Sequence, residues 1–296
     1  SYLDNQKQME MFEQLVGKNI RNFEVYKSRY DLAIKLQSVY PLNTALQKYV
    51  GAYYIDSKKF DLALPFLYEY IKNDKSKYEV LRQIIDIEIS RSNWDSVISV
   101  SKYAIDIVPN NSDLYLIKGN AFVQKNKFFD ALSILKLGEE LTYLKTQRIH
   151  FYNLLGETFF LLDSASQYHN YFSQSLRLDS LNIQTISRYA LLRAIENVDN
   201  QKTLKLIDLA VSIDADYAEI NLANAIIFKN LQNYEQALIE VEKLIGKIEN
   251  RYFYENYGDI LFLNNNDSQA LICWDKAKEF GAVIDIPRKK LILQKK

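Results

Sequence analysis

The sequence has few of the residues that interrupt regular structure or cross-link a chain. Its 296 residues include 4 Pro and 8 Gly. Such scarcity is typical of a mostly helical chain, because these two residues mark turns and break helices. The single cysteine, Cys273, excludes an internal disulfide. It does not fix the compartment, since proteins without disulfides occur in every compartment.

Long apolar runs and an excess of one charge are missing as well. No run of about 18 apolar residues occurs, so no segment is expected to span a membrane as a helix. Lys plus Arg and Asp plus Glu both number 37, which makes the formal net charge zero. A nucleic-acid-binding protein normally carries a basic excess, so this balance argues against that class.

Combinations of residues that carry chemistry are also missing from the sequence. There are two histidines, and neither has Cys, Asp or Glu beside it at metal-ligand spacing. We expect His150 to face solvent and His169 to lie on a helix surface. No P-loop, G-x-G-x-x-G or G-x-S-x-G motif occurs. Cys273 is interpreted as a structural thiol, because nothing near it in sequence would lower its pKa. We therefore predict no catalytic residue, no metal site and no cofactor.

What the chain does have is a repeat of about 34 residues. Successive anchor positions lie 33 to 37 residues apart, at Gly17, Gly51, Ile85, Gly119, Gly156, Leu191, Ala225 and Gly258. Four of the eight positions twelve residues after an anchor are alanine, at Ala63, Ala131, Ala237 and Ala270. Pro41 and Pro109 both stand 24 residues after an anchor, where a helix should end.

Each repeat unit is expected to form two antiparallel helices joined by a short turn. Apolar residues recur at spacings of 3 and 4 within a unit, which places them on one helix face. Small residues at the anchors let the two helix backbones approach closely, and Trp274 is expected to fill the space beside them. One such pair cannot bury its apolar stripe alone, so neighbouring pairs must stack.

The chain resembles the tetratricopeptide repeat (TPR) family over about residues 10–283. The matching stretches are KYVGAYYIDSKKFDLALPFLYEYI, YLIKGNAFVQKNKFFDALSILK, INLANAIIFKNLQNYEQALIEVEKLI and YENYGDILFLNNNDSQALICWDKAKEF. The resemblance implies an all-α fold, an α-solenoid superhelix of about seven to eight antiparallel helix pairs. The chain departs from the family pattern where large residues replace the small ones, at Ile85, Leu191, Tyr168 and Thr203.

The repeat pattern also suggests three regions. Residues 1–43 would be an N-terminal helical pair, a degenerate repeat or cap, since Arg29 stands at a core position. Residues 44–283 would be the TPR array. Residues 284–296 would be a C-terminal capping helix, with Pro287 in its first turn. A basic anchor for an anionic surface is the alternative interpretation of this last segment.

A second stripe on the first helix of each unit is the expected binding surface. The resemblance implies that this stripe lines the concave side, where family members hold peptides or helices. Asn120, Asn153 and Arg188 would hydrogen-bond a peptide backbone, and Leu116 and Ile226 would offer apolar contact, as would Phe160. The candidate partner-binding residues are Lys48, Arg82, Asp86, Asn120, Asn153, Glu157, Arg188 and Lys229. Lys48 is followed by Ala52 rather than Asn, so a clamp for a C-terminal carboxylate is not expected.

The leading hypothesis is a non-enzymatic protein–protein interaction scaffold or adaptor that binds a peptide or protein in its concave groove. The alternatives are a substrate-recruiting or regulatory module of a larger enzyme or envelope assembly, an RNA-binding helical repeat, and self-association. Richness in Asn, Lys, Ile and Tyr suggests a bacterial source, with the chain in the cell envelope, held there by a lipid anchor, or in the cytoplasm. The opening SYLDNQKQ suggests a trimmed chain.

Overall fold

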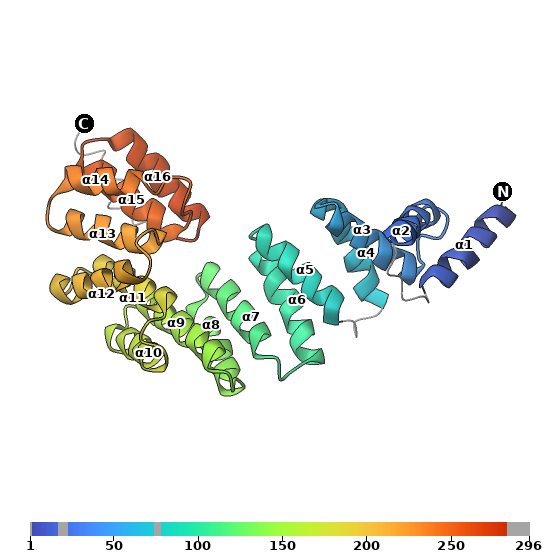
Figure 1. Cartoon of the computed structure of the whole chain (residues 1–296), viewed down its shortest axis with the longest axis horizontal. Coiled ribbons are helices and arrows are strands. Elements are labelled where there is room, and N and C mark those ends of the chain that lie inside the picture. Colours follow the sequence, from blue (N-terminus) through green and yellow to red (C-terminus); the bar gives the residue numbers. More distant parts are fainter. Residues whose placement is uncertain (1, 17–22, 74–77, 283–296) are drawn as a thin grey trace. The chain divides into compact units, whose positions relative to one another are not determined.

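The computed structural model describes residues 2–16, 23–73 and 78–282 (Figure 1). These residues form helices, turns and loops, and no β-strand is found among them. Consecutive helices pack against each other in pairs along the chain. The prediction of an all-α fold built from helix pairs is therefore confirmed.

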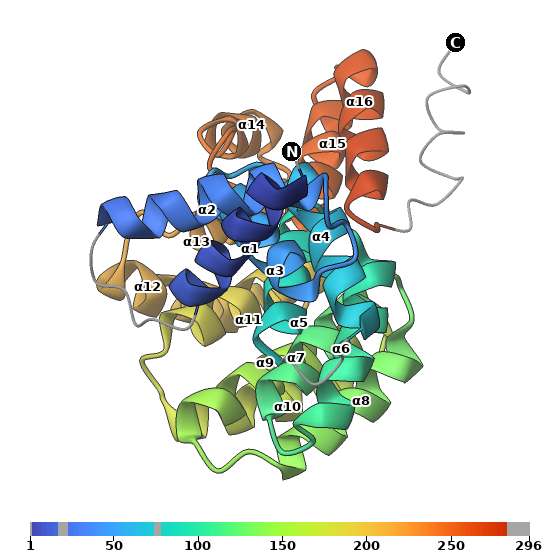
Figure 2. The same cartoon turned by 90° about the vertical axis from the view of Figure 1, so that its right-hand side faces the viewer.

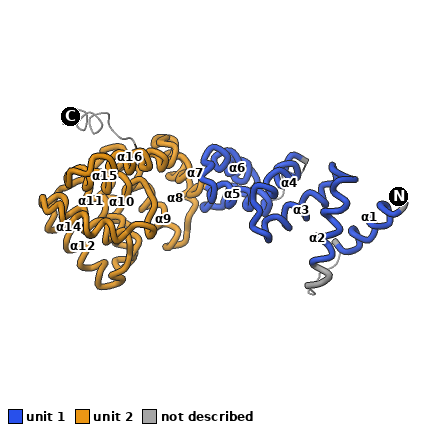
Figure 3. Tube along the Cα trace, turned by 90° about the horizontal axis from the view of Figure 1, so that it is seen from above, with its two compact units in different colours: residues 1–114 blue, residues 115–296 orange. Residues whose placement is uncertain are grey.

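The chain divides into two compact units, residues 1–114 (unit 1) and residues 115–296 (unit 2), coloured separately in Figure 3. The described helices of unit 1 are α1 (Tyr2–Val16), α2 (Phe23–Gln37), α3 (Thr44–Asp56), α4 (Phe60–Asn73), α5 (Tyr78–Ser90), α6 (Trp94–Ile107) and the first turn of α7 (Ser112–Gln124). The rest of α7 belongs to unit 2, with α8 (Phe128–Glu140), α9 (Lys145–Leu161), α10 (Ala165–Leu178), α11 (Ile183–Glu196), α12 (Asn200–Ile213), α13 (Ala218–Asn230), α14 (Tyr234–Glu242), α15 (Arg251–Leu263) and α16 (Asp267–Glu279).

The glycine anchors of the repeat lie where the two helices of a pair touch. A Cβ atom added to Gly119 would lie only 2.3 Å from Cδ2 of Leu135, whereas carbon atoms pack at about 3.5–4.0 Å. Glycine is needed there because any larger residue would push the helices apart. Figure 2 shows α15 and α16 side by side, the pair in which Trp274 fills the space beside Gly258, as predicted. The same relation joins Gly51 to Leu67 and Gly156 to Phe172.

Where the anchor is a large residue and not glycine, the residue at the corresponding position of the second helix can be small. Ile85 is fully buried, and Ser101, the corresponding residue of the second helix, is fully buried too. A large anchor is thus matched by a small residue, the reverse of the pair Gly119 and Leu135. The described positions twelve and nineteen residues after an anchor are all buried. Even Arg29 is buried, with its Nη1 donating to the Tyr49 hydroxyl at 3.1 Å.

The turn inside a helix pair has a recurring backbone conformation. Seven residues after the anchor, the chain adopts a left-handed φ in six of the repeats, at Lys58, Ser92, Asn126, Asp163, Gln232 and Asn265. The next backbone N–H donates to the carbonyl five residues back, as in the 2.8 Å bond from Lys59 to Tyr54. This arrangement is the Schellman motif, which satisfies carbonyls that the helix end leaves without a partner. The position usually favours glycine, yet none of the six residues is glycine.

Helix starts and ends follow the local sequence. Asn43, Asn182 and Asn250 cap α3, α11 and α15, because each side-chain oxygen accepts a hydrogen bond from the backbone N–H three residues later. Pro41 and Pro109 follow the ends of α2 and α6, as predicted. His150 lies inside α9, which begins at Lys145.

Three sequence predictions are not settled by this fold. The proposed capping helix at residues 284–296 and the first anchor, Gly17, lie outside the described residues. The proposed boundary between residues 43 and 44 stays a prediction. Among the helices that the structure describes, none is both long and apolar enough to cross a membrane.

Candidate functional site

A cavity of about 460 Å³ opens on the first helices of successive pairs in unit 2. We call it the inner cavity. Its walls come from α7, α9, α11 and α13, which supply the side chains that the repeat placed on one stripe. The lining residues are Leu116, Ile117, Asn120, His150, Asn153, Leu154, Glu157, Gln184, Arg188, Tyr217 and Glu219. Four helices in adjacent repeats therefore contribute to one site.

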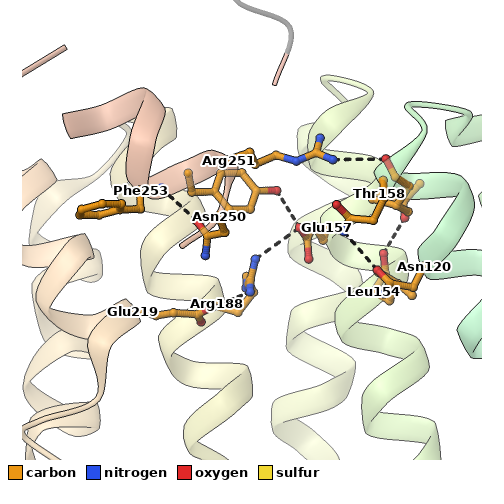
Figure 4. Close-up of polar contacts among 12 residues, drawn as sticks. Asn120, Leu154, Glu157, Thr158, Arg188, Glu219, Asn250, Arg251 and Phe253 are labelled. Carbon is orange, nitrogen blue, oxygen red and sulfur yellow. Dashed lines mark hydrogen bonds and ion pairs between the residues drawn. The ribbon is translucent and has the colours of Figure 1, made fainter. Parts of the chain in front are cut away.

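Arg188 is the electrostatic centre of the inner cavity. Its Nη1 lies 3.3 Å from Oε1 of Glu157, and its Nη2 contacts Oε1 of Glu219 (Figure 4). The Arg188 guanidinium carbon also lies 5.4 Å from the centre of the Tyr252 ring, within the range of a cation–π interaction. One guanidinium is thus shared by two carboxylates, and the three groups together carry one negative charge.

Burial and these charges shift the pKa values of the cluster. Burial acts to lower the pKa of Arg188, but Glu157 and Glu219 outweigh it, so this pKa is raised and the guanidinium stays charged. Burial raises the pKa of the Glu219 carboxyl, and the nearby Glu157 adds to that rise while Arg188 opposes it. The pKa of Tyr252 is raised by burial and by Glu157. Burial is the largest cause of the rise at Glu219, and the Arg188 guanidinium does not cancel it.

Helix α15 closes unit 2 onto the helices where the unit begins. The Tyr252 hydroxyl donates to Oε1 of Glu157 at 2.8 Å. Arg251 donates from Nη1 to Oδ1 of Asn126 and from Nη2 to the Val123 carbonyl, both at 3.3 Å. A smaller cavity of about 150 Å³ lies beside this closure and shares Asn120, Glu157 and Arg188 with the inner cavity. The closure therefore bounds one side of the site.

The side-chain amides around the inner cavity differ in how many hydrogen bonds they form within the protein. Asn153 is engaged, because its Nδ2 donates to the Thr185 hydroxyl at 2.9 Å and its Oδ1 accepts from that hydroxyl at 3.1 Å. Asn120 accepts a 3.3 Å hydrogen bond from Gln124 at Oδ1. The Asn120 amide nitrogen donates no hydrogen bond to the described residues, so it can donate to a ligand.

The structure brings together four of the eight candidate residues, namely Asn120, Asn153, Glu157 and Arg188. It gives Arg188 a different role from the one expected, since its guanidinium is taken up by two carboxylates and not left for a peptide backbone. Sequence reasoning did not single out Tyr217 or Gln184. Tyr217 precedes α13 and lies off the stripe, so no helical spacing could have identified it.

The other candidates lie elsewhere. Lys229 lines a separate cavity of about 390 Å³ beside Trp274, and its Nζ donates to Oδ1 of Asn256 at 2.8 Å. In unit 1, Lys48 is exposed, and Arg82 forms a 3.1 Å ion pair with Asp86 one helical turn away. Lys229 therefore does not line the inner cavity.

Two of the expected apolar contacts are also corrected. Ile226 is fully buried, because α13 packs between α11 and α15, so it cannot offer a contact to a ligand. Phe160 packs edge-on against Tyr168 and lines a different cavity of about 290 Å³. Leu116 does line the inner cavity.

The titratable groups outside the cluster fit structural roles. Cys273 is 7% exposed and burial raises its pKa, which confirms the prediction of a structural thiol. His150 is exposed, as predicted, at the rim of the inner cavity. His169 lies 2.9 Å from the Tyr189 hydroxyl, and burial lowers its pKa. In the described ranges, no group of three or more His, Cys, Asp or Glu could hold a metal ion.

Stacked helix pairs with a cavity on their first helices give the chain a TPR-like fold. No protein-family model and no curated protein matches the sequence. The structure is similar to a tetratricopeptide repeat protein from Parabacteroides merdae ATCC 43184, with a TM-score of 0.66 and 12% identity over 84% of this chain and 97% of that one. It is also similar to a chain of the Cut9–Hcn1 hetero-tetramer of the APC/C, with a TM-score of 0.60 and 11% identity over 90% of this chain and 52% of that one. Yeast Tom70 is a third similar structure, with a TM-score of 0.53 and 14% identity over 90% of this chain and 57% of that one. At such identities the likeness shows the fold alone.

Proposed function

We propose that the protein is a non-enzymatic interaction scaffold that holds a segment of a partner protein in the inner cavity of unit 2. The observation that carries this proposal is the convergence of four adjacent first helices on one cavity of about 460 Å³. Ligand sites are typically about 300–1,000 Å³, so the cavity has room for a few side chains. The first-helix face is also the usual working surface of a helical-repeat solenoid.

The chemistry of the inner cavity supports binding over catalysis. Its strongest groups, Arg188, Glu157 and Glu219, are paired with one another within the cluster. A catalytic acid or base needs a nucleophile or a substrate proton within reach, and the cavity lining contains no Cys or Ser. Apolar walls at Leu116 and Leu154 beside amide groups suit a peptide, which offers both apolar side chains and backbone hydrogen-bonding groups.

The RNA-binding alternative is disfavoured by the same charges. A backbone-binding groove for nucleic acid needs positive potential, whereas the groups that line the inner cavity sum to one negative charge. No feature of the described residues favours a regulatory module of an enzyme over a free-standing scaffold.

A pair of matched variants tests the proposal. Gln184 is exposed at the wall of the cavity, so Gln184→Phe should fill it without breaking a core contact. Gln201 is exposed on α12, a second helix, and Gln201→Phe adds the same bulk away from the cavity. Partners captured by the wild-type protein from cells are identified, and the affinity of each partner is then measured with both variants.

We expect Gln184→Phe to weaken binding at least about tenfold, or about 1.4 kcal/mol, while Gln201→Phe leaves it unchanged. Circular dichroism should show the same helical content in all three proteins. Equal affinity for the wild-type protein and Gln184→Phe would place binding outside the inner cavity and refute the proposal.

A further inference from the structure

The inner cavity has an uncompensated negative charge. Glu157, Arg188 and Glu219 are 16%, 24% and 14% exposed at their side chains, so all three are partly shielded from water yet reachable from the cavity. A partly buried charge is costly unless an opposite charge lies against it. Two carboxylates share one guanidinium, and a second positive charge would complete the set.

Among the residues that the structure describes, the charged groups around the inner cavity do not supply that second charge. The remaining lining residues of the inner cavity are neutral apart from the titratable His150, which is exposed at the rim. Arg251 lies at the smaller cavity, and its guanidinium is directed to the Val123 carbonyl and to Asn126 at the C-terminal end of α7. Lys229 is bound to Asn256, with Asp259 at 3.7 Å, beside a different cavity.

The shape of the inner cavity suits a long side chain with a polar end. Leu116, Ile117 and Leu154 provide apolar wall for a methylene stem, and Glu157 and Glu219 line the same cavity. Basic side chains bury such stems along apolar surface and keep the charged group at a polar site. Contacts from α15 bound one side of the site.

We propose that the inner cavity receives an arginine or lysine side chain of the partner, whose positive charge is met by Glu157 and Glu219 beside Arg188. This inference rests on the proposed function and names the chemistry of the segment that is held. Charge complementarity of this kind fixes the register of a bound segment and rejects acidic competitors.

Short blocked peptides test the inference on the full chain. The probes are acetyl-Gly-Arg-Gly-amide, its lysine and glutamate counterparts, and the citrulline peptide, which keeps the shape of arginine without its charge. Binding is followed through amide chemical shifts of the labelled protein, with attention to α9, α11 and α13. The arginine and lysine peptides should shift these signals, and the citrulline and glutamate peptides should require at least about tenfold higher concentrations.

Variants then localise the effect. Glu219→Gln should weaken the arginine peptide by at least about tenfold, whereas Glu235→Gln, which neutralises an exposed glutamate on α14, should not. Circular dichroism and thermal unfolding check that Glu219→Gln remains folded. If Glu219→Gln unfolds the protein, the citrulline comparison in the wild-type protein still decides the matter.

Three results would overturn the inference. Equal binding of the arginine and citrulline peptides would exclude charge recognition and leave the scaffold proposal standing. Arginine binding that is unaffected by Glu219→Gln in the folded variant would place the charge site elsewhere. No shift in the inner helices with any basic peptide would refute the inference, and the partner measurements on Gln184→Phe would then judge the scaffold proposal independently.

Discussion

Gly119 offers a direct test of how the helix pairs are held together. In an ordinary helix interior, replacing glycine by alanine stabilises by about 1 kcal/mol. At Gly119 the added Cβ would lie 2.3 Å from Cδ2 and 2.5 Å from Cγ of Leu135, both in the partner helix. Relief of such overlap costs about 1–3 kcal/mol. An overlap this severe places the cost in the upper part of that range, about 2–3 kcal/mol. We therefore expect Gly119→Ala to destabilise unit 2 by about 1–2 kcal/mol, because overpacking outweighs the gain in helix propensity.

The effect should change sign when the opposing side chain is removed. Leu135→Ala alone should cost about 2–5 kcal/mol, because Leu135 is fully buried. In that background the new methyl group of Gly119→Ala enters the vacated space, so it should stabilise by about 1 kcal/mol. The coupling energy between the two sites should therefore be about 2–3 kcal/mol.

Urea unfolding followed by tryptophan fluorescence provides the assay. The chain has two tryptophans, Trp94 in unit 1 and Trp274 in unit 2, so a Trp94→Phe background reports on unit 2 alone. Gly246 serves as the control, because its φ is +77° and no atom lies within 4 Å of an added Cβ. Gly246→Ala should destabilise equally with and without Leu135. Stabilisation by Gly119→Ala in both backgrounds would refute the close-packing argument.

Three further predictions follow from buried groups and turns. The Tyr68 hydroxyl donates to the buried Glu88 carboxylate at 2.7 Å, and burial followed by that hydrogen bond raises the pKa of Tyr68 from 10.0 to about 12. The contribution of this tyrosine to stability is therefore complete below pH 10 and is lost as the pH rises from 10 to about 12. Over that range the free energy of unfolding should fall less in Tyr68→Phe than in the wild-type protein. Burial raises the pKa of the Cys273 thiol, so the native protein should react with a disulfide reagent at pH 8 far more slowly than the urea-unfolded chain; comparable rates would contradict its burial. Ser92 has a φ of +54°, so Ser92→Gly should stabilise the protein by about 1 kcal/mol and raise the urea concentration at the unfolding midpoint. An unchanged or lower midpoint would contradict the strain argument.

Much of the fold could be predicted because the repeated residues pack against each other within one helix pair. Gly258 and Trp274 lie on two helices of one hairpin, so the fit between them is recorded within a short stretch of sequence. At Ile85 and Ser101 the large residue lies on the first helix and the small residue on the second, and both belong to one hairpin. A search for small residues at the anchors alone treats Ile85 as an exception. Hydrophobic spacing within each unit was enough to place these helices.

The candidate site could be predicted only in part because it depends on contacts between repeats. Arg251 and Val123 are far apart in sequence, and nothing in the stretch RYFYENYG indicates that its arginine binds the end of α7. The stripe rule assumed that first helices leave their inner faces open. Tight packing of α13 against α11 and α15 instead buries Ile226, and the closure directs Tyr252 to Glu157.

The left-handed residues in the hairpin turns that the structure describes are positions at which single helix pairs can be perturbed independently. Lys58, Ser92 and Gln232 each occupy a conformation that glycine would adopt with less strain. Because each belongs to a different helix pair and lies outside the inner cavity, glycine can be introduced one pair at a time. Hydrogen exchange on such a series would reveal the order in which the pairs open, and would show whether the repeats melt as one cooperative body or as separate segments.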